Sequence, residues 1–383
     1  MKNILKNNKL ILYFGGDINS SNVAKVEEEA NKELEGKTFT SLELDFEEVK
    51  YISSAGLRMI LKLKQKYGDV AVTNVTLEVY DVFQMTGFTD ILTVNKALRK
   101  IDISKATLIG EGYFSLVYRI DKDTIIKVYK NSSHPDDIKR ELNLAKQAFV
   151  LGIPTAISFD IVRVGDKLGV VFEMLDSVSL RDLFRDYPDR YKELIVKYTD
   201  LLKKINSTEP TDNSLPNTKD LWLEKVEVCK PYLTKEQYQK CHDLIMTIPE
   251  KNTFVHGDCH FKNIMTQGDE LFLIDMDTLS KGHHIFELAA IYAPYIAFEE
   301  DDPGNNERFL GVPSELVHKI YDDVLEHYFS KLTEEIKIKI KIVAYIHMIY
   351  WNRVNEPNNN VRLEGCKGRL IPLLDQVKDL VIE

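Results

Sequence analysis

Three oxygen-bearing side chains near residue 260 have the spacing needed for phosphoryl transfer. Asp258 and Asn263 belong to one run, His256–Asn263, and Asp275 follows after a gap that fits a short hairpin. A carboxylate can accept or orient the proton of a hydroxyl group. A second carboxylate and an amide oxygen are hard ligands suited to Mg²⁺. Alone, Asp258 and Asn263 would be ordinary turn residues, so the prediction needs the rest of a nucleotide site.

Further parts of such a site lie upstream in the expected order. The two glycines of residues 110–118 let a strand–turn–strand segment approach phosphate, with backbone N–H groups facing it. Lys127 lies inside an apolar, strand-like segment, where its ammonium needs a partner. A nucleotide phosphate and the carboxylate of Glu141, in the helical run 136–150, would suffice. The alternative is that Lys127 lies at a strand edge and extends to water.

Together these residues resemble the aminoglycoside phosphotransferase/choline kinase family, the small-molecule branch of the protein-kinase-like fold, over roughly residues 105–383. The resemblance implies a bilobal fold that uses ATP and Mg²⁺. It implies a nucleotide-binding lobe at 105–175 and a helical lobe at 176–383 that holds the catalytic loop and the acceptor site. The implied catalytic residues are Asp258 as base, Lys127 on the phosphates and Glu141 as its ion-pair partner; the implied metal ligands are Asn263 and Asp275. The implied nucleotide contacts are Gly110, Gly112, Ser115, Val117, Lys127, Glu173 and Leu175.

The chain departs from this family pattern at a few positions. Ser115 stands where protein kinases have their third glycine, and Gly257 stands where they have the Arg of His-Arg-Asp. Glu287 replaces the Asp of a later Asp-Leu-Ala run, which bears on how the catalytic loop is braced. Residues 172–175 are expected to form the hinge, whose backbone would bind adenine. His260 is interpreted as a structural hydrogen-bonding residue.

The first hundred residues alternate strand and helix patterns and resemble the STAS domain of anti-sigma-factor antagonists. We expect strands near 9–14, 41–46 and 70–73, and helices at 22–34, from 57 onward and near 77–86, with Ser20 or Ser21 capping the first helix. Ser54 occupies the family's phosphorylation position, but Ser53 replaces its Asp. A phosphate there would meet a helix N-terminus. We favour the simpler interpretation that Ser54 caps the helix.

Charge and cysteine usage restrict the partners. Residues 1–100 carry 14 basic and 14 acidic side chains, so the net charge of −10 belongs to the rest of the chain. An acidic surface without a basic stripe argues against nucleic acid. The four cysteines show no metal-binding spacing and fit a reducing cytoplasm. The apolar run near the N-terminus is too short for a signal peptide, so we expect no membrane association.

The predicted fold class is α/β and α+β: a small STAS-type sheet with helices at 1–97, a linker at 98–104, then the kinase-like lobes. Helical patterns in the second lobe cover 180–185, 190–206, 219–233, 235–248, 314–332 and 333–353. Residues 336–342 alternate like a strand, but the flanking pattern favours helix. Two features suggest a cationic acceptor: the acidic run Glu299–Asp302, and the aromatic rings of Tyr345, Tyr350 and Trp351. Both also suit a solvated loop and a packed core.

The sequence therefore predicts an ATP- and Mg²⁺-dependent O-phosphotransferase for a small hydroxylated, in one interpretation cationic, molecule. A STAS module would regulate or dock it, with a protein as its partner. The alternative is a signalling kinase or assembly hub that phosphorylates a STAS partner or its own Ser54. Only eleven residues separate Asp275 from Glu287, which is short for a peptide-docking segment and favours a small acceptor.

Overall fold

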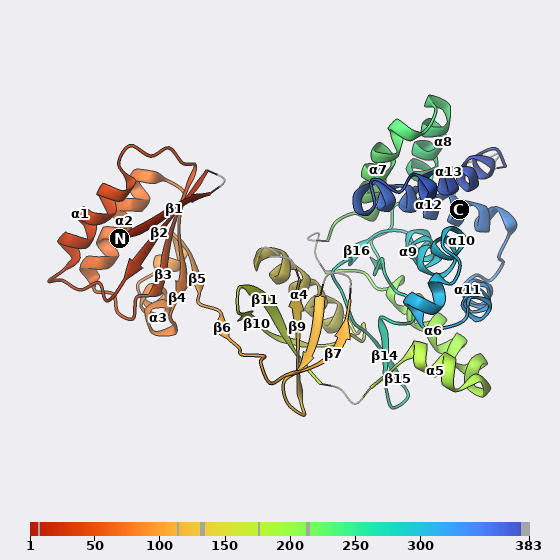
Figure 1. Ribbon diagram of the computed structural model, residues 1–383, viewed down its shortest axis with the longest axis horizontal. Coiled ribbons are helices and arrows are strands. Elements are labelled where there is room, and N and C mark those ends of the chain that lie inside the picture. The colour runs from red at the N-terminus through yellow and green to blue at the C-terminus, as the bar shows by residue number, and fades with distance from the viewer. Residues whose placement is uncertain (7, 113–114, 131–134, 175–176, 212–214, 377–383) are drawn as a thin grey trace. The chain divides into compact units, whose positions relative to one another are not determined.

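The computed structural model describes residues 1–6, 8–112, 115–130, 135–174, 177–211 and 215–376. The chain divides into two compact units. The first comprises Met1–Asp102 with Ile161–Asp166, and the second comprises Ile103–Asp160 with Lys167–Glu383. Figure 1 shows the elements of each unit, and they are described separately below.

The first unit is a five-stranded sheet in the order β1-β2-β3-β4-β5, with helices packed against it (Figure 1). The strands β2 to β5 run parallel, and β1 pairs antiparallel with β2. The strands are β1 (Lys2–Lys6), β2 (Lys9–Gly15), β3 (Ser41–Glu48), β4 (Val70–Val75) and β5 (Thr93–Lys96). The helices are α1 (Val23–Leu34), α2 (Ser54–Tyr67) and α3 (Leu77–Met85). Alternate residues of β2 and β3, such as Leu10, Leu12, Leu42 and Leu44, are fully buried, as their period-two pattern predicts.

Two expected helix caps in this unit are wrong. The Oγ atom of Ser53, at 3.3 Å, accepts the backbone N–H of Gly56, so Ser53 caps α2. Ser54 is instead the first residue of the helix and is exposed. The N-cap of α1 is Asn22, without a side-chain cap bond, in place of Ser20 or Ser21. A Cβ at Gly56 would lie 2.7 Å from the side chain of Ile52, which explains the glycine in this turn.

The second unit begins with the strands that carry the glycine run and Lys127. The six-stranded sheet has the order β6-β10-β11-β9-β8-β7, and α4 (Pro135–Val150) packs beside it. Its strands are β6 (Arg99–Lys100), β7 (Thr107–Glu111), β8 (Ser115–Arg119), β9 (Thr124–Tyr129), β10 (Ser158–Val164) and β11 (Lys167–Glu173). The short strand β6 lies in the predicted linker and pairs in parallel with Val162 and Arg163 of β10; these paired residues belong to the first unit.

The remainder of the second unit is mainly helical, as predicted. The helices are α5 (Leu180–Asp186), α6 (Tyr191–Ile205), α7 (Thr218–Cys229), α8 (Lys235–Thr247), α9 (His284–Tyr292), α10 (Phe298–Asp301), α11 (Ser314–Tyr328), α12 (Glu334–Asn355) and α13 (Asn360–Leu374). Short strands between them are β12 (Val178–Ser179), β13 (Phe254–Val255), β14 (Ile264–Gln267), β15 (Glu270–Leu273) and β16 (Ser280–Lys281). Residues 336–342 are helical, as expected, whereas α9 and α13 were not predicted.

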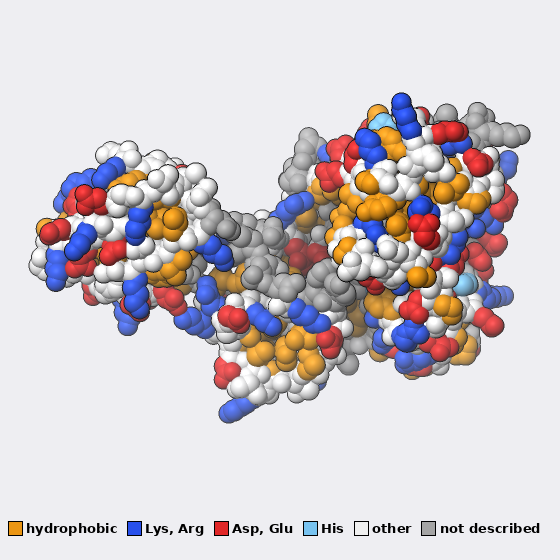
Figure 2. Space-filling view, turned by 45° about the horizontal axis from the view of Figure 1, so that its top comes forward, with side chains coloured by type: hydrophobic (Ala, Val, Ile, Leu, Met, Phe, Trp, Pro, Cys, Tyr) orange, Lys and Arg blue, Asp and Glu red, His pale blue; other side chains and the backbone are white. Residues whose placement is uncertain are grey.

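Surface charge is mixed in the first unit. Figure 2 shows acidic and basic side chains interspersed on the visible face of this unit, in agreement with the equal numbers of the two in residues 1–100. Within the part of the chain that the structure describes, no helix combines the length and the apolar character needed to cross a membrane.

Candidate active site

A two-stranded hairpin brings Asn263 and Asp275 next to each other. In β14 and β15, Ile264 pairs with Leu273, and beyond this pair the backbone N–H of Ile274 donates to the Asn263 carbonyl at 2.9 Å. Asn263 therefore enters the hairpin where Asp275 leaves it. The gap that separates the two residues in the sequence is the hairpin itself.

Asp258 and Asn263 are held in contact across the loop that precedes β14. The Asn263 Nδ2 atom donates to the Asp258 carboxylate Oδ2 at 2.9 Å and to the Asp258 carbonyl at 3.0 Å. Asn263 is nearly buried, whereas the Asp258 side chain is 41% exposed. The amide nitrogen is thus engaged, and within the described residues no donor reaches the amide oxygen, which leaves that oxygen available as a ligand.

Lys127 joins the sheet to the hairpin. Its strand, β9, lies between β8 and β11, and its Nζ atom is 3.4 Å from Glu141 Oε1 and also pairs with the Asp275 carboxylate. Tyr129 donates its hydroxyl to Glu141 Oε2 at 2.7 Å, which fixes the glutamate. Burial alone would lower the pKa of Lys127, but the charges of Asp275 and Glu141 outweigh it and raise the pKa. The ammonium is therefore permanently charged and aimed at the hairpin.

Asp275 has a backbone conformation that non-glycine residues rarely adopt. Its φ angle is +65°, in the left-handed region that Asp and Asn tolerate better than other side chains. Such conformations are concentrated at functional sites. Nearby, the Asp277 side chain is exposed, but the protein around its carboxylate removes part of its hydration. This shielding, together with the charge of Asp275, raises the pKa of Asp277 to about 7.

A buried carboxylate holds the loop before Asp258 in place through hydrogen bonds. Glu287, on α9, is fully buried and accepts the backbone N–H groups of His256 at 2.5 Å and Gly257 at 3.2 Å. Burial raises the pKa of Glu287 to about 7, although both hydrogen bonds favour the ionised form. Gly257 has a φ of +81°, and a Cβ there would lie 3.2 Å from the Thr278 carbonyl. The Glu that departs from the family pattern thus still braces the loop.

The glycine run forms a hairpin between β7 and β8. Gly110 pairs with Val117, and the Gly112 N–H donates to the Ser115 carbonyl at 2.9 Å. Neither glycine has a positive φ, and a Cβ at either would meet only ordinary contacts beyond 3.4 Å. The chain itself therefore does not require glycine at these positions. A ligand that approaches the backbone closely would require it.

The expected hinge lies at the end of β11. Glu173 is the last residue of this strand, and the next backbone N–H, that of Met174, donates to the Asp123 carbonyl at 2.8 Å. That N–H is therefore engaged within the chain. Leu175, the other predicted hinge contact, lies outside the described residues.

The donor atoms present suit Mg²⁺. The Asp275 carboxylate and the free amide oxygen of Asn263 are hard oxygen donors from adjacent positions of the hairpin. Among the described residues, no group of three or more His, Cys, Asp or Glu side chains could hold a metal ion. A site with one amide ligand does not need such a group, because Mg²⁺ keeps waters and nucleotide phosphates among its ligands.

His260, which the sequence predicts to be a structural hydrogen-bonding residue, lies beside the carboxylate of Asp258. It is buried, and its Nε2 atom is 3.6 Å from Asp258 Oδ1, beyond a good hydrogen bond. Its ring packs edge-on against Phe309. The carboxylate of Asp258 is therefore flanked by Asn263 on one oxygen and by this imidazole on the other.

Both features that suggested a cationic acceptor are used inside the protein. Each carboxylate of the acidic run has a partner within the chain: Glu299 with the N–H groups of Gly304 and Asn306, Glu300 and Asp301 with Arg369, and Asp302 with Arg308. Each aromatic ring has one of the chain's own cations beside it: Tyr345 has Arg369, Tyr350 has Lys225 and Trp351 has Arg362. These groups build the helical lobe.

Comparisons with known proteins identify two families in this chain. Residues 2–101 match the family model of the STAS domain, and residues 105–312 match that of the phosphotransferase enzyme family. A putative anti-sigma factor antagonist, BtrV of Bordetella bronchiseptica, is 34% identical over 89 residues, which are 22% of this chain and 76% of that protein. Both family resemblances inferred from the sequence are confirmed.

Solved structures with some similarity to this chain include two phosphotransferases. One is the ADP-bound aminoglycoside phosphotransferase APH(2'')-Ib, with 16% identity, a TM-score of 0.48, and coverage of 72% of this chain and 94% of that chain. Another is a choline/ethanolamine kinase family protein from Mesorhizobium loti, with 11% identity, a TM-score of 0.47, and coverage of 72% and 89%.

Proposed function

Since this chain belongs to the phosphotransferase enzyme family through residues 105–312 and carries a STAS domain at residues 2–101, we propose that it transfers phosphate from ATP, with Mg²⁺, to a hydroxyl group of a small molecule. One observation carries the proposal. The Lys127 ammonium bridges Glu141 and Asp275, and the hairpin places Asp275 beside the Asp258–Asn263 pair. A cation for phosphate, a base and hard ligands thus converge in one place.

Asp258 is the proposed base. Asn263 holds its Oδ2, so Oδ1 remains to accept a proton from a hydroxyl group in the open site. In the proposed step, the acceptor oxygen bonds to the γ-phosphorus, the bond to the ADP oxygen breaks, and the hydroxyl proton passes to Asp258. The brace from Glu287 keeps this loop in place during the step.

Lys127 and the glycine hairpin are proposed to hold the phosphates. Lys127 supplies a fixed positive charge, and the absence of side chains at Gly110 and Gly112 lets the phosphates approach the backbone of the hairpin closely. Asn263 and Asp275 would hold Mg²⁺, which neutralises charge on the phosphates when bound. Most of the catalysis then comes from position and electrostatics, which these residues provide before substrate arrives.

The acceptor is proposed to be small and hydroxylated. The segment between Asp275 and Glu287 has eleven residues, part of which form β16 and the start of α9, so it offers little platform for a peptide. Because the acidic run and the aromatic rings are occupied internally, the proposal assigns the acceptor no charge.

The STAS domain is proposed to regulate or dock this activity through a protein partner. A second candidate function is signalling, in which the kinase-like unit phosphorylates a STAS serine. One observation favours this candidate: Ser53 provides the cap of α2, so the hydroxyl of Ser54 is exposed and not committed to the helix.

The proposal is tested by supplying Mg·ATP with a panel of aminoglycosides and hydroxylated metabolites and measuring ADP release. A compound that stimulates release well above the no-acceptor rate, and gains one phosphate by mass spectrometry, is the expected result. The Asp258→Asn variant is the matched control and should lack the stimulation. Phosphate that appears on protein serine while no compound is modified would overturn the small-acceptor proposal in favour of signalling.

A further inference from the structure

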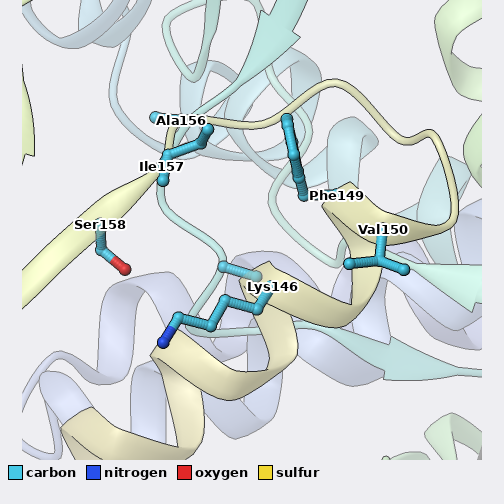
Figure 3. Close-up of a pocket in the computed structure, with 7 residues that line it drawn as sticks. Lys146, Phe149, Val150, Ala156, Ile157 and Ser158 are labelled. Atoms are coloured by element: carbon cyan, nitrogen blue, oxygen red, sulfur yellow. The ribbon is translucent and has the colours of Figure 1, made fainter.

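A small pocket opens at the end of α4, outside the candidate active site (Figure 3). It has a volume of about 170 Å³ and is lined by Ala145, Lys146, Phe149, Val150, Ala156, Ile157 and Ser158. The helix end provides the first four of these residues, and the segment leading into β10 provides the others. We call it the α4 pocket. All of its residues belong to the second unit.

The lining is apolar with one unsatisfied polar atom. Ser158 is only 6% exposed and lines the pocket, and among the residues that the structure describes its Oγ atom has no hydrogen-bond partner. A buried hydroxyl without a partner is unfavourable, since its hydrogen bonds to water are lost and not replaced. The pocket therefore offers apolar contact and a hydrogen bond to whatever fills it.

The size of the pocket restricts its occupant. A cavity of about 150 Å³ accommodates benzene, so the α4 pocket has room for one large apolar side chain. Sites for whole organic ligands are usually larger, roughly 300–1,000 Å³, and enclose most of the ligand. Here the rim instead carries the exposed apolar side chains of Phe149 and Val150, and Val150 is 80% exposed. A polypeptide that inserts one side chain and covers the rim with its neighbours fits this shape.

The charge at the rim specifies what flanks the inserted side chain. Lys146 lines the pocket, is exposed, and forms no ion pair with any residue of the described ranges. The described lining contains no acidic side chain to oppose a carboxylate. We propose that the α4 pocket is a docking site for a protein partner, through a segment with one large apolar side chain flanked by acidic residues. A backbone group of that segment satisfies Ser158.

The pocket is joined to the candidate active site from two sides. The helix α4 also carries Glu141, the partner of Lys127. The segment 154–156 hydrogen-bonds to Leu273 at the end of β15, with Leu273 N–H to the Pro154 carbonyl at 2.8 Å and Ala156 N–H to the Leu273 carbonyl at 3.0 Å. Asp275 follows two residues later. Filling the pocket therefore stabilises the two elements that position Lys127 and Asp275, and should tighten Mg·ATP binding; this part rests on the proposed function.

The test uses the full-length chain with labelled alanine and isoleucine methyl groups and the probe peptide N-acetyl-Glu-Phe-Glu-amide. We expect saturable shifts of the methyl signals of Ala145, Ala156 and Ile157, with a dissociation constant on the order of 1 mM. The matched peptide N-acetyl-Glu-Ala-Glu-amide should cause none. Free phenylacetate that binds as tightly as the peptide would assign the pocket to small molecules and overturn the proposal.

Variants locate the site. Ala156→Leu fills the pocket and should abolish peptide binding. Val150→Glu places a negative charge, the same sign as that of the peptide, at a rim position that is 80% exposed. It should leave folding unaffected and weaken binding. Lys146→Glu should weaken it about two- to fivefold, as expected for an exposed ion pair. Lys331→Glu, the same charge change on an exposed lysine elsewhere in the unit, should leave it unchanged. Equal affinity in the wild type and the three pocket variants would refute the site.

The coupling has its own readout. Saturating Mg·ATP should tighten the peptide by the same factor by which the peptide tightens Mg·ATP, because coupling between two binding sites is reciprocal. Peptide binding that is the same with and without Mg·ATP would refute the coupling and not the docking site. If the wild type does not bind Mg·ATP at all, the result would instead count against the proposed function.

Discussion

Replacing Glu287 by Gln should remove one specific component of the pH dependence of stability. In the wild type, this buried carboxyl accepts two backbone N–H groups of the catalytic loop, and burial raises its pKa to about 7 from an ordinary value of 4.5. Gln has nearly the same shape and retains one acceptor oxygen, but it cannot ionise. The difference between the two proteins therefore isolates the titration of Glu287.

The magnitude follows from the raised pKa. Below pH 4.5 the carboxyl is protonated in both the folded and the unfolded chain. Between pH 4.5 and about 7 the unfolded chain releases this proton while the folded chain retains it, so the free energy of unfolding falls as the pH rises. Since one pKa unit corresponds to ~1.4 kcal/mol, the total loss attributable to Glu287 is about 3 kcal/mol. Above pH 7 no further loss is expected from this group.

Tryptophan fluorescence provides a selective assay. Both tryptophans of the chain, Trp222 and Trp351, lie in the second unit, so urea unfolding followed by their emission reports on the unit that contains Glu287. The stability of the wild type relative to Glu287→Gln should fall by about 3 kcal/mol between pH 4.5 and 8. Other titrating groups, such as His283 and His284, affect both proteins equally and cancel in the difference. Two parallel stability curves would refute the reasoning that burial dominates this carboxyl.

Three further predictions concern the metal ligands, the glycine hairpin and the STAS serine. Asp275→Asn, which retains the tolerance for a left-handed backbone but loses the negative charge, should strongly weaken the Mg²⁺-dependent part of ATP affinity in calorimetry. Asp277→Asn should do much less, and equal losses would make the two aspartates joint ligands. Gly112→Ala should leave the urea midpoint unchanged and weaken Mg·ATP binding, whereas a lower midpoint would show that the glycine serves the chain itself. Ser54 should remain unphosphorylated after incubation with Mg·ATP, because the segment after Asp275 is short. The Ser54 hydroxyl is exposed, so a missing phosphate would not be explained by burial. Stoichiometric phosphate on Ser54 by mass spectrometry would contradict the prediction.

The sequence predicts best those elements whose residues alternate between two environments. The strands β2, β3 and β4 have a buried and a less buried face, and their period-two pattern is visible in the chain. The strand β1 is exposed along most of its length and shows no such contrast, so it was missed. The helix α9 was missed for the opposite reason: nearly all of its residues are buried, which leaves no amphipathic period. In α13, an internal Pro372 argues against the helix that forms.

Within the candidate site, residue types were predictable and exact contacts were not. The ion pair between Lys127 and Asp275 joins residues far apart in the chain, and no local pattern predicts it. The cap of α2 shifted by one residue, from Ser54 to Ser53, because a cap depends on the backbone angles of a single position. The acidic run and the aromatic rings pointed to a ligand only while their partners in the folded chain were unknown. Arg369, which pairs with two of the acidic residues, lies near the end of the chain.

The most direct test of the central claim is transfer of labelled γ-phosphate from ATP to an identified acceptor by the wild type and by Asp258→Asn. The variant should bind Mg·ATP with unchanged affinity, because Lys127, Asn263 and Asp275 all remain. Its rate of transfer should fall by about 10²- to 10⁴-fold, the range for a lost general base. A variant that transfers phosphate at a rate close to that of the wild type would contradict the assignment of Asp258 and the account of the site built around it.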